Sequence, residues 1–264
     1  MAMKLSEGLP DDIVSQVDRL EVNRHGDQPG SHMVTESING HVAPGTSYRL
    51  EADGFLSAVP EDAPTPSAVV NDTPPPNVRI SGAWRGGDGS KATDGNILGG
   101  VGTLIVNEAD VAIPEAPCTA VALGFYGAAL LSVGDIFSFD TNANMPVTVM
   151  EIGPNYTDGF LHLEEKGGGT YLEHHDRPHL HVPLNRESAG HMLYARQDGD
   201  SYLISGFRIP HGKAVYSTPH VLHADAYLIG RYMVIYSLTD NFSNVVFRSE
   251  DGTLVNASVG YKVT

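Results

Sequence analysis

Tight-turn dipeptides recur along the chain and separate short runs of β-branched and aromatic residues. Asp-Gly pairs occupy positions 53–54, 88–89, 94–95, 158–159, 198–199 and 251–252, and an Asn-Gly pair occupies 39–40. Such pairs tolerate the positive φ angles of two-residue hairpins. The runs that predict strands cover residues 102–106, 147–152, 202–209, 214–217, 227–238 and 244–248. No comparable stretch places apolar residues at the i, i+3, i+4 and i+7 spacing of a helix over three turns. The sequence therefore predicts an all-β fold, an antiparallel barrel or sandwich.

The first 76 residues have a different texture. Asp11 and Asp12 precede apolar residues at helical spacing, which predicts one short amphipathic helix. Six prolines follow between Pro60 and Pro76, and they favour an extended arm that lies on the domain. We therefore expect an N-terminal helix and proline-rich arm over residues 1–76 and a β-barrel over residues 77–264. A second, degenerate barrel before residue 145 is the alternative.

Hydropathy gives no sign of a membrane segment. The longest uncharged stretch, residues 116–134, is interrupted by glycines and is expected to form two buried strands and a turn. The first residues contain no apolar run typical of a secretory signal. Cys118 is the only cysteine, so neither an intramolecular disulfide nor a CxxC zinc site can form. These features favour a cytoplasmic protein without a membrane partner.

The charge balance excludes another class of partner. The chain carries 16 Lys and Arg against 32 Asp and Glu, a formal net charge of −16. Proteins that follow the phosphates of nucleic acids need clustered basic residues, which this chain lacks. We expect neither a nucleic acid nor an anionic membrane as partner.

Histidines gather in one part of the chain. Nine of the twelve lie between His162 and His223. Because alternate side chains of a strand share a face, His179 and His181 should project together, about 7 Å apart. Two such imidazoles can bind one divalent ion, with a third partner from a neighbouring strand. Glu187 is the nearest downstream carboxylate, and His223 can arrive from a later strand.

The two histidine-bearing segments resemble the two motifs of the cupin superfamily. The first motif is Gly, five residues, His-x-His, three or four residues, Glu and then Gly. His179 and His181 match its histidine pair. Glu187 stands at the glutamate with five intervening residues, and Glu173 occupies the position of the first glycine.

The second cupin motif is Gly, five residues, Pro-x-Gly, two residues and His. Gly212 and His223 match its ends, whereas Thr218 and His220 replace the internal proline and glycine. The resemblance covers residues 169–225. It implies an antiparallel double-stranded β-helix, or jelly roll, whose interior holds a metal ion. The implied ligands are His179, His181, His223 and Glu187, with Glu173 or His175 as substitutes for Glu187.

The resemblance implies a metal-dependent enzyme that acts on a small polar or anionic metabolite. With iron the chemistry would be that of a dioxygenase, and with manganese, zinc or nickel that of an isomerase or lyase. Arg208 can hold a substrate carboxylate or phosphate, and a tyrosine can move a proton. The candidate catalytic residues on strands beside the ligands are Tyr194, Arg208, Tyr216 and His191.

Two other functions remain open. A cupin-like module could bind or sense a ligand without turnover, or a structural β protein could use its arm for assembly. Exposed edge strands and an N-terminal arm often mediate association, so a homo-oligomer is expected in each case.

Overall fold

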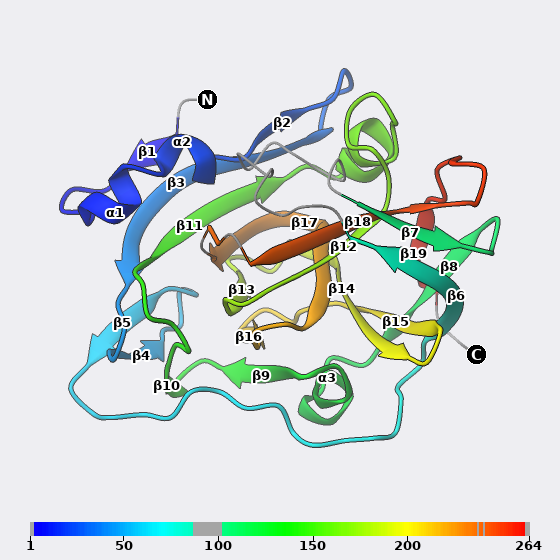
Figure 1. The fold of residues 1–264 in the computed structure, drawn as a ribbon. Coiled ribbons are helices and arrows are strands. Elements are labelled where there is room, and N and C mark those ends of the chain that lie inside the picture. Colours follow the sequence, from blue (N-terminus) through cyan, green and yellow to red (C-terminus); the bar gives the residue numbers. More distant parts are fainter. Residues whose placement is uncertain (1–2, 87–101, 237, 240, 262–264) are drawn as a thin grey trace.

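The computed structural model describes residues 3–86, 102–236, 238–239 and 241–261, and strands are its dominant secondary structure (Figure 1). The all-β class is therefore confirmed. The helical elements are α1 (Asp11–Val14), α2 (Val17–Leu20), α3 (Ala120–Tyr126) and the π-helical turn η2 (Thr157–Leu161). The first eleven strands are β1 (Lys4–Leu5), β2 (Asn23–His25), β3 (His32–Val42), β4 (Ser47–Leu50), β5 (Leu56–Val59), β6 (Val78–Arg85), β7 (Thr103–Val106), β8 (Val111–Ala116), β9 (Ala128–Ser132), β10 (Ile136–Ser138) and β11 (Met145–Ile152). The remaining strands are β12 (Tyr171–His175), β13 (His179–Pro183), β14 (Ala189–Asp198), β15 (Ser201–Phe207), β16 (Lys213–Ser217), β17 (Leu222–Ile235), β18 (Phe242–Arg248) and β19 (Ala257–Tyr261).

These strands form one large sheet and one small sheet. Sixteen strands belong to the large sheet, and β10, β4 and β5 form the small one. Most neighbours are antiparallel, but β1 with β3, β7 with β18, and β8 with both β15 and β19 are parallel pairs. The expectation of an antiparallel fold is therefore only partly met, because the large sheet is mixed.

Strand β17 joins the two halves of the large sheet. Its first part, up to Ile229, pairs with β14, whereas its second part pairs with β11 from Gly230 onward and with β13 from Tyr232. Gly230 has a φ of +98°, a conformation that costs little only for glycine. The strand can thus change partners at this residue. The half of the large sheet with β14 and the half with β11 and β13 curve around a common interior (Figure 1).

Alternation along the strands creates two separate cores. On β13, Leu180 and Val182 belong to a core that includes Tyr48 and Phe137 of the small sheet. His179 and His181 alternate with them and therefore face the opposite side, the interior between the halves of the large sheet. The small sheet consequently covers the outer face of the strands that carry these histidines.

Of the dipeptides predicted to form two-residue hairpins, one is confirmed and two lie inside other elements. The 198–199 pair begins the tight hairpin between β14 and β15, with Asp198 opposite Ser201. The 39–40 pair instead lies inside β3, and the 158–159 pair lies inside η2, where a helical turn replaces the expected hairpin. The 88–89 and 94–95 pairs lie outside the described residues.

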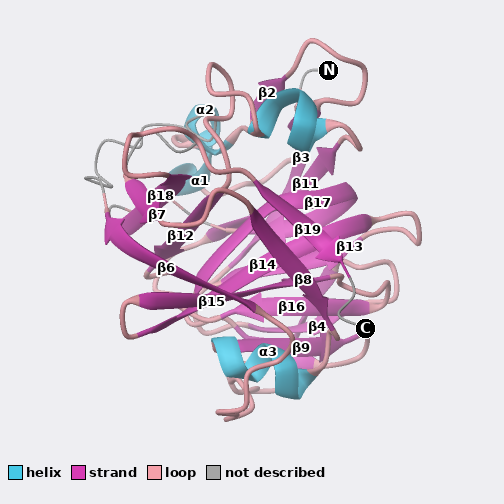
Figure 2. Ribbon diagram, turned by 90° about the vertical axis from the view of Figure 1, so that its right-hand side faces the viewer, coloured by secondary structure: helices cyan, strands magenta, loops and turns pink. Residues whose placement is uncertain are grey.

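The uncharged stretch 116–134 also differs from the prediction. It forms α3 followed by β9, not two strands. Thr119 caps the helix by accepting a 3.2 Å hydrogen bond from the amide of Ala122, and Gly127 ends it with a φ of +88°. Figure 2 shows α3 beside β9 at the foot of the molecule.

The N-terminal 76 residues contain more than a helix and an arm. Two four-residue helices replace the single helix expected, and β1 to β5 add strands to both sheets. The proline-rich residues between β5 and β6 form no helix or strand, and they contact the small sheet through a 3.2 Å bond from the Ser138 amide to the Pro64 carbonyl. Within the described ranges, no helix has the length and hydropathy needed to cross a membrane.

Candidate functional site

Three strands bring a group of histidines and one glutamate together in the interior. Glu173 and His175 lie two residues apart on β12 and therefore share a face, and His179 begins β13 after a three-residue connection. His223 on β17 stands directly opposite Glu173 in the strand register. The fold thus aims four potential ligands at one point.

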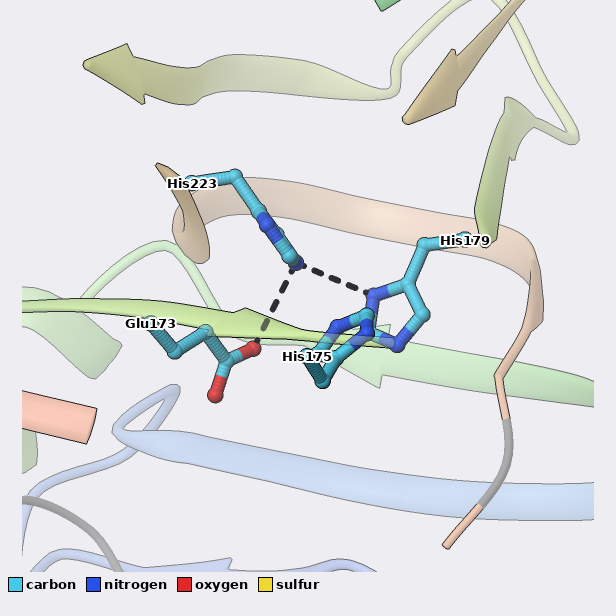
Figure 3. A group of neighbouring side chains, drawn as sticks. All are labelled: Glu173, His175, His179 and His223. Carbon is cyan, nitrogen blue, oxygen red and sulfur yellow. Dashed lines mark hydrogen bonds and ion pairs between the residues drawn. The ribbon is translucent and has the colours of Figure 1, made fainter. Parts of the chain in front are cut away.

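The four side chains point toward one another, as Figure 3 shows. One ligand atom from each residue lies within 4.8 Å of the others. The Nε2 atom of His223 is 3.2 Å from Nδ1 of His179 and 3.6 Å from Oε1 of Glu173. The ring centroids of His175 and His179 are 4.1 Å apart. Three imidazoles and one carboxylate at this spacing could hold a metal ion.

Backbone contacts fix the orientation of His223 and of the segment before it. The Nδ1 atom of His223 lies 2.8 Å from the carbonyl oxygen of Val221, so this nitrogen donates and Nε2 carries the lone pair. The amide of His220 donates to the carbonyl oxygen of His175 at 2.7 Å. This bond ties the approach to β17 to the end of β12.

His175 differs from the other histidines of the group. The residue is 5 % exposed, yet neither ring nitrogen has a hydrogen-bond partner among the described residues. A buried polar group without a partner costs about 1–3 kcal/mol. A metal ion bound to His175 would remove this cost, so the donor set fits such an ion.

The interior keeps these imidazoles neutral. Burial, reinforced by the neighbouring imidazole of His223, lowers the pKa of His175 to about 3. Burial also lowers the pKa of His223 to about 4 and holds that of His179 well below its usual value. Neutral imidazoles offer the lone pairs that a cation needs.

Glu173 responds to its surroundings in the opposite way. Burial and the charge of Asp225 raise its pKa to about 8, against the attraction of Arg24. In the absence of a cation the carboxyl group therefore holds a proton near neutral pH. Binding of a metal ion would displace that proton.

A second polar group adjoins the four ligands. Asp225 accepts a 2.8 Å hydrogen bond from the hydroxyl of Tyr171 and lies 3.3 Å from Nε2 of His181. Although burial opposes it, these contacts hold the pKa of Asp225 below its usual range. Arg24 on β2 is 8 % exposed and donates to the hydroxyl of Tyr156 at 3.2 Å. Its charge favours the anionic form of Asp225.

The structure brings some of the predicted ligands together but not all. His179 and His223 are in the group, and so are both of the proposed substitutes, Glu173 and His175. His181 shares the face of His179 but contacts Asp225, and it is not one of the four. Glu187 is exposed in the loop after β13, beyond the strand that would have carried it inward. The carboxylate of the group is therefore that of Glu173, which corrects the expectation for Glu187.

The two predicted catalytic tyrosines lie on different faces. Tyr194 stands opposite His223 in the strand register, and its hydroxyl is 2.6 Å from the Oγ atom of Ser217. Tyr216 neighbours Ser217 along β16 and so faces the other side, where its hydroxyl accepts a bond from the amide of Asp140. It belongs to the core beneath the small sheet, which rules out contact with the interior group.

The other two catalytic candidates lie at a separate surface hollow. His191 and Arg208 both line this hollow, and neither belongs to the interior group. The structure therefore places them at this hollow and not among the four grouped residues. His191 is on β14 but stands opposite Tyr227, four residues along β17 from His223.

Glu173 and His175 were expected only as substitutes for Glu187, although their spacing in the sequence carries a signal. Gly167 is followed by five residues, Glu173-x-His175, three residues and His179. Arg24 gave no signal, because it reaches the interior from a segment expected to lie outside the barrel.

No protein-family model, curated protein or solved structure matches the chain.

Proposed function

We propose that this chain is a metal-dependent enzyme with a cupin-like double-stranded β-helix and that it acts on a small polar or anionic substrate. Its ligands are Glu173, His175, His179 and His223. The ion is divalent, and imidazole-rich sites suit iron, zinc and nickel, with manganese favoured by the carboxylate.

The observation that carries the proposal is the position of His175. Its two ring nitrogens are buried and lack partners among the described residues, and its ring lies against those of His179 and His223. Purely structural histidines are normally satisfied by hydrogen bonds. A group of neutral imidazoles around an acid, with one imidazole left unsatisfied, is typical of a site that binds a cation.

The spacing of the ligands supports the cupin-like assignment. The series Gly167, five residues, Glu173-x-His175, three residues and His179 has the spacing of the first cupin motif, with glutamate and one histidine exchanged. At the second motif, His220 stands at a glycine position and has a φ of +68°. The backbone there keeps the conformation that favours glycine.

The residues around the ligands suit catalysis on a small polar molecule. A bound divalent ion supplies Lewis acidity for isomerisation or elimination, or, as iron, a site for dioxygen chemistry. Asp225 orients His181 and Tyr171 through its two oxygens. Arg24 adds a buried positive charge that favours an anionic substrate. The buried strands exclude bulk water, which strengthens these electrostatic interactions.

Metal analysis of the full chain tests the first half of the proposal. We expect about one divalent ion per chain in the wild type and in His211→Ala, whose side chain is exposed, but almost none in His175→Ala. Metal content that is low in the wild type, or that is equal in both variants, would reject the site.

Turnover assays test the second half. The metal-loaded chain should consume oxygen or convert a member of a carboxylate and keto-acid panel, and His175→Ala should abolish that conversion. If a metabolite binds tightly but no product forms, the chain is a ligand-binding module and not an enzyme.

A further inference from the structure

A second polar site lies away from the metal ligands, four residues along β17 from His223. It is a hollow of about 550 Å³ on the surface, large enough for a small metabolite. Its polar lining comes from η2, β14, β17 and the segments that flank β15 and β19. The polar residues include Asp158, His162, His191, Arg208, Tyr227 and Asn256.

Two imidazole–carboxylate pairs stand at this hollow. The Nε2 atom of His191 lies 2.8 Å from Oε2 of Glu115. His162 lies 3.4 Å from a carboxylate oxygen of Asp158 through Nδ1 and 3.0 Å from the hydroxyl of Tyr227 through Nε2. Both rings are therefore held in place before any ligand arrives.

Glycines make room for the ring of His191. A Cβ atom at Gly260 would lie 2.6 Å from Cε1 of the imidazole, and one at Gly206 would lie 3.4 Å from its Cβ. Real Cβ atoms do not approach as closely as the first of these distances, so a side chain at Gly260 would displace the ring. The position of His191 is thus built into two strands.

Arg208 is the cationic residue of the hollow. It is exposed, and no carboxylate of the described residues lies within ion-pair distance of its guanidinium. Several other arginines of this acidic chain have such partners, as Arg231 has Glu36 and Arg248 has Glu164. With 32 acidic residues for 16 basic ones, an arginine without an acid beside a hollow is a candidate anchor for a ligand.

We propose that this hollow binds a small organic molecule through its carboxylate, which Arg208 holds with paired N–H donors. Asp158 lines the hollow and Glu115 contacts His191, and their carboxylates would repel a dianionic phosphate more strongly than a singly charged carboxylate. Tyr227 and Asn256 supply neutral polar groups for the rest of the ligand. The inference depends on no metal ion and is independent of the proposed enzyme.

Titration followed by NMR tests the hollow directly. The probe is sodium butyrate, a singly charged carboxylate, with butyramide as the uncharged analogue of the same shape, and the readout is the ring-proton signals of His162 and His191. We expect saturable shifts of both signals with butyrate only. Arg208→Ala should weaken binding at least tenfold, whereas Arg186→Ala, which removes an exposed arginine outside the hollow, should not change it.

Chelator-treated protein provides the second arm of the test. Butyrate should bind it as tightly as it binds untreated protein, because the metal ligands lie elsewhere. Three results would overturn the proposal: no saturable shift, equal binding to Arg208→Ala, or loss of binding on metal removal, which would assign the probe to the metal centre.

Discussion

The Nε2 atom of His223 on β17 lies 3.2 Å from the Nδ1 atom of His179 on β13. Two imidazole nitrogens that share one metal ion, each about 2.0–2.1 Å from it, stand about 3.0–3.4 Å apart. Since Nδ1 of His223 donates to the Val221 carbonyl, Nε2 carries no proton, and in the metal-free chain it accepts a hydrogen bond from Nδ1 of His179. The separation therefore suits both the hydrogen bond and a pair of ligands.

Metal binding should raise the stability of the fold. A ligand present at 100 times its dissociation constant stabilises the native state by about 2.7 kcal/mol. For a chain of this size we expect the melting temperature to rise by about 5–10 °C when metal is added to chelator-treated protein. Differential scanning calorimetry measures the shift, and His175→Ala should abolish it while His211→Ala keeps it.

Replacing His175 by leucine should separate stability from metal binding. In the metal-free chain, His175→Leu removes two buried nitrogens that lack partners in the described part of the structure, and it keeps a side chain of similar size. Because such nitrogens cost about 1–3 kcal/mol, we expect the variant to be as stable as the wild type or more so in urea titrations. It should bind no metal.

A matched substitution provides the comparison for His175→Leu. Tyr194→Phe removes a hydroxyl that is buried and bonded to Ser217 at 2.6 Å. It leaves the Ser217 hydroxyl without that partner and should destabilise the chain by about 1–2 kcal/mol. If His175→Leu lost as much stability as Tyr194→Phe in metal-free protein, the view of His175 as an unsatisfied group would be wrong.

The metal-free chain should be most stable near pH 6.5–7. Burial lowers the pKa values of His175, His179, His223 and His162 in the folded state, so the unfolded state binds more protons below about pH 6.5. Their stabilising contribution is present above that pH and is lost as the pH falls. Glu173 has the opposite sign, because its folded-state pKa is raised to about 8 and its contribution is lost as the pH rises from about 4.5 to 8.

Between about pH 4.5 and 6.5 the stabilising effect of four histidines outweighs the destabilising effect of one glutamate, so the free energy of unfolding should rise with pH. Above pH 7 only the effect of Glu173 remains, and the free energy of unfolding should fall slightly. Urea midpoints at half-unit steps of pH, in the presence of a chelator, measure this curve. Saturating metal should remove the decline above pH 7, since a bound cation keeps Glu173 ionised. A curve that rises steadily to pH 8 in metal-free protein would contradict the assignment of Glu173.

The sequence predicts the parts of this molecule that depend on local period and spacing. The all-β class and His179 and His223 as members of the cluster follow from alternation along strands and from the concentration of histidines. The prediction of Glu187 as a ligand is wrong because the strand that carries His179 ends at Pro183, four residues before Glu187. No local sequence signal shows that the strand ends there.

Features that depend on long-range packing could not be predicted from the sequence. The apolar residues 116–134 suit a strand as well as a helix, and the cap at Thr119 decides for α3. Tyr216 points away from the site into the core beneath the small sheet, and no local pattern reveals that this sheet covers the outer face of β16. Arg24 enters the interior only because β2 pairs with β3 of the large sheet.

The backbone at His220 should respond to substitution in a way that reaches the metal ligands. His220 is the only non-glycine residue of the described chain with a left-handed φ, +68°, and its side chain is exposed. A β-branched residue tolerates this conformation poorly, whereas glycine adopts it without strain. We expect His220→Gly to keep or slightly increase stability and His220→Val to lower it by about 1–2 kcal/mol.

Metal content should follow the same order. The amide of His220 donates to the carbonyl oxygen of His175, so a strained turn disturbs a ligand directly. His220→Gly should therefore bind metal as the wild type does, and His220→Val should bind it several-fold more weakly. His211→Val, at an exposed position with ordinary φ, controls for the loss of a surface imidazole. Equal metal affinity and equal urea midpoints for the glycine and valine variants would show that this turn does not position His175.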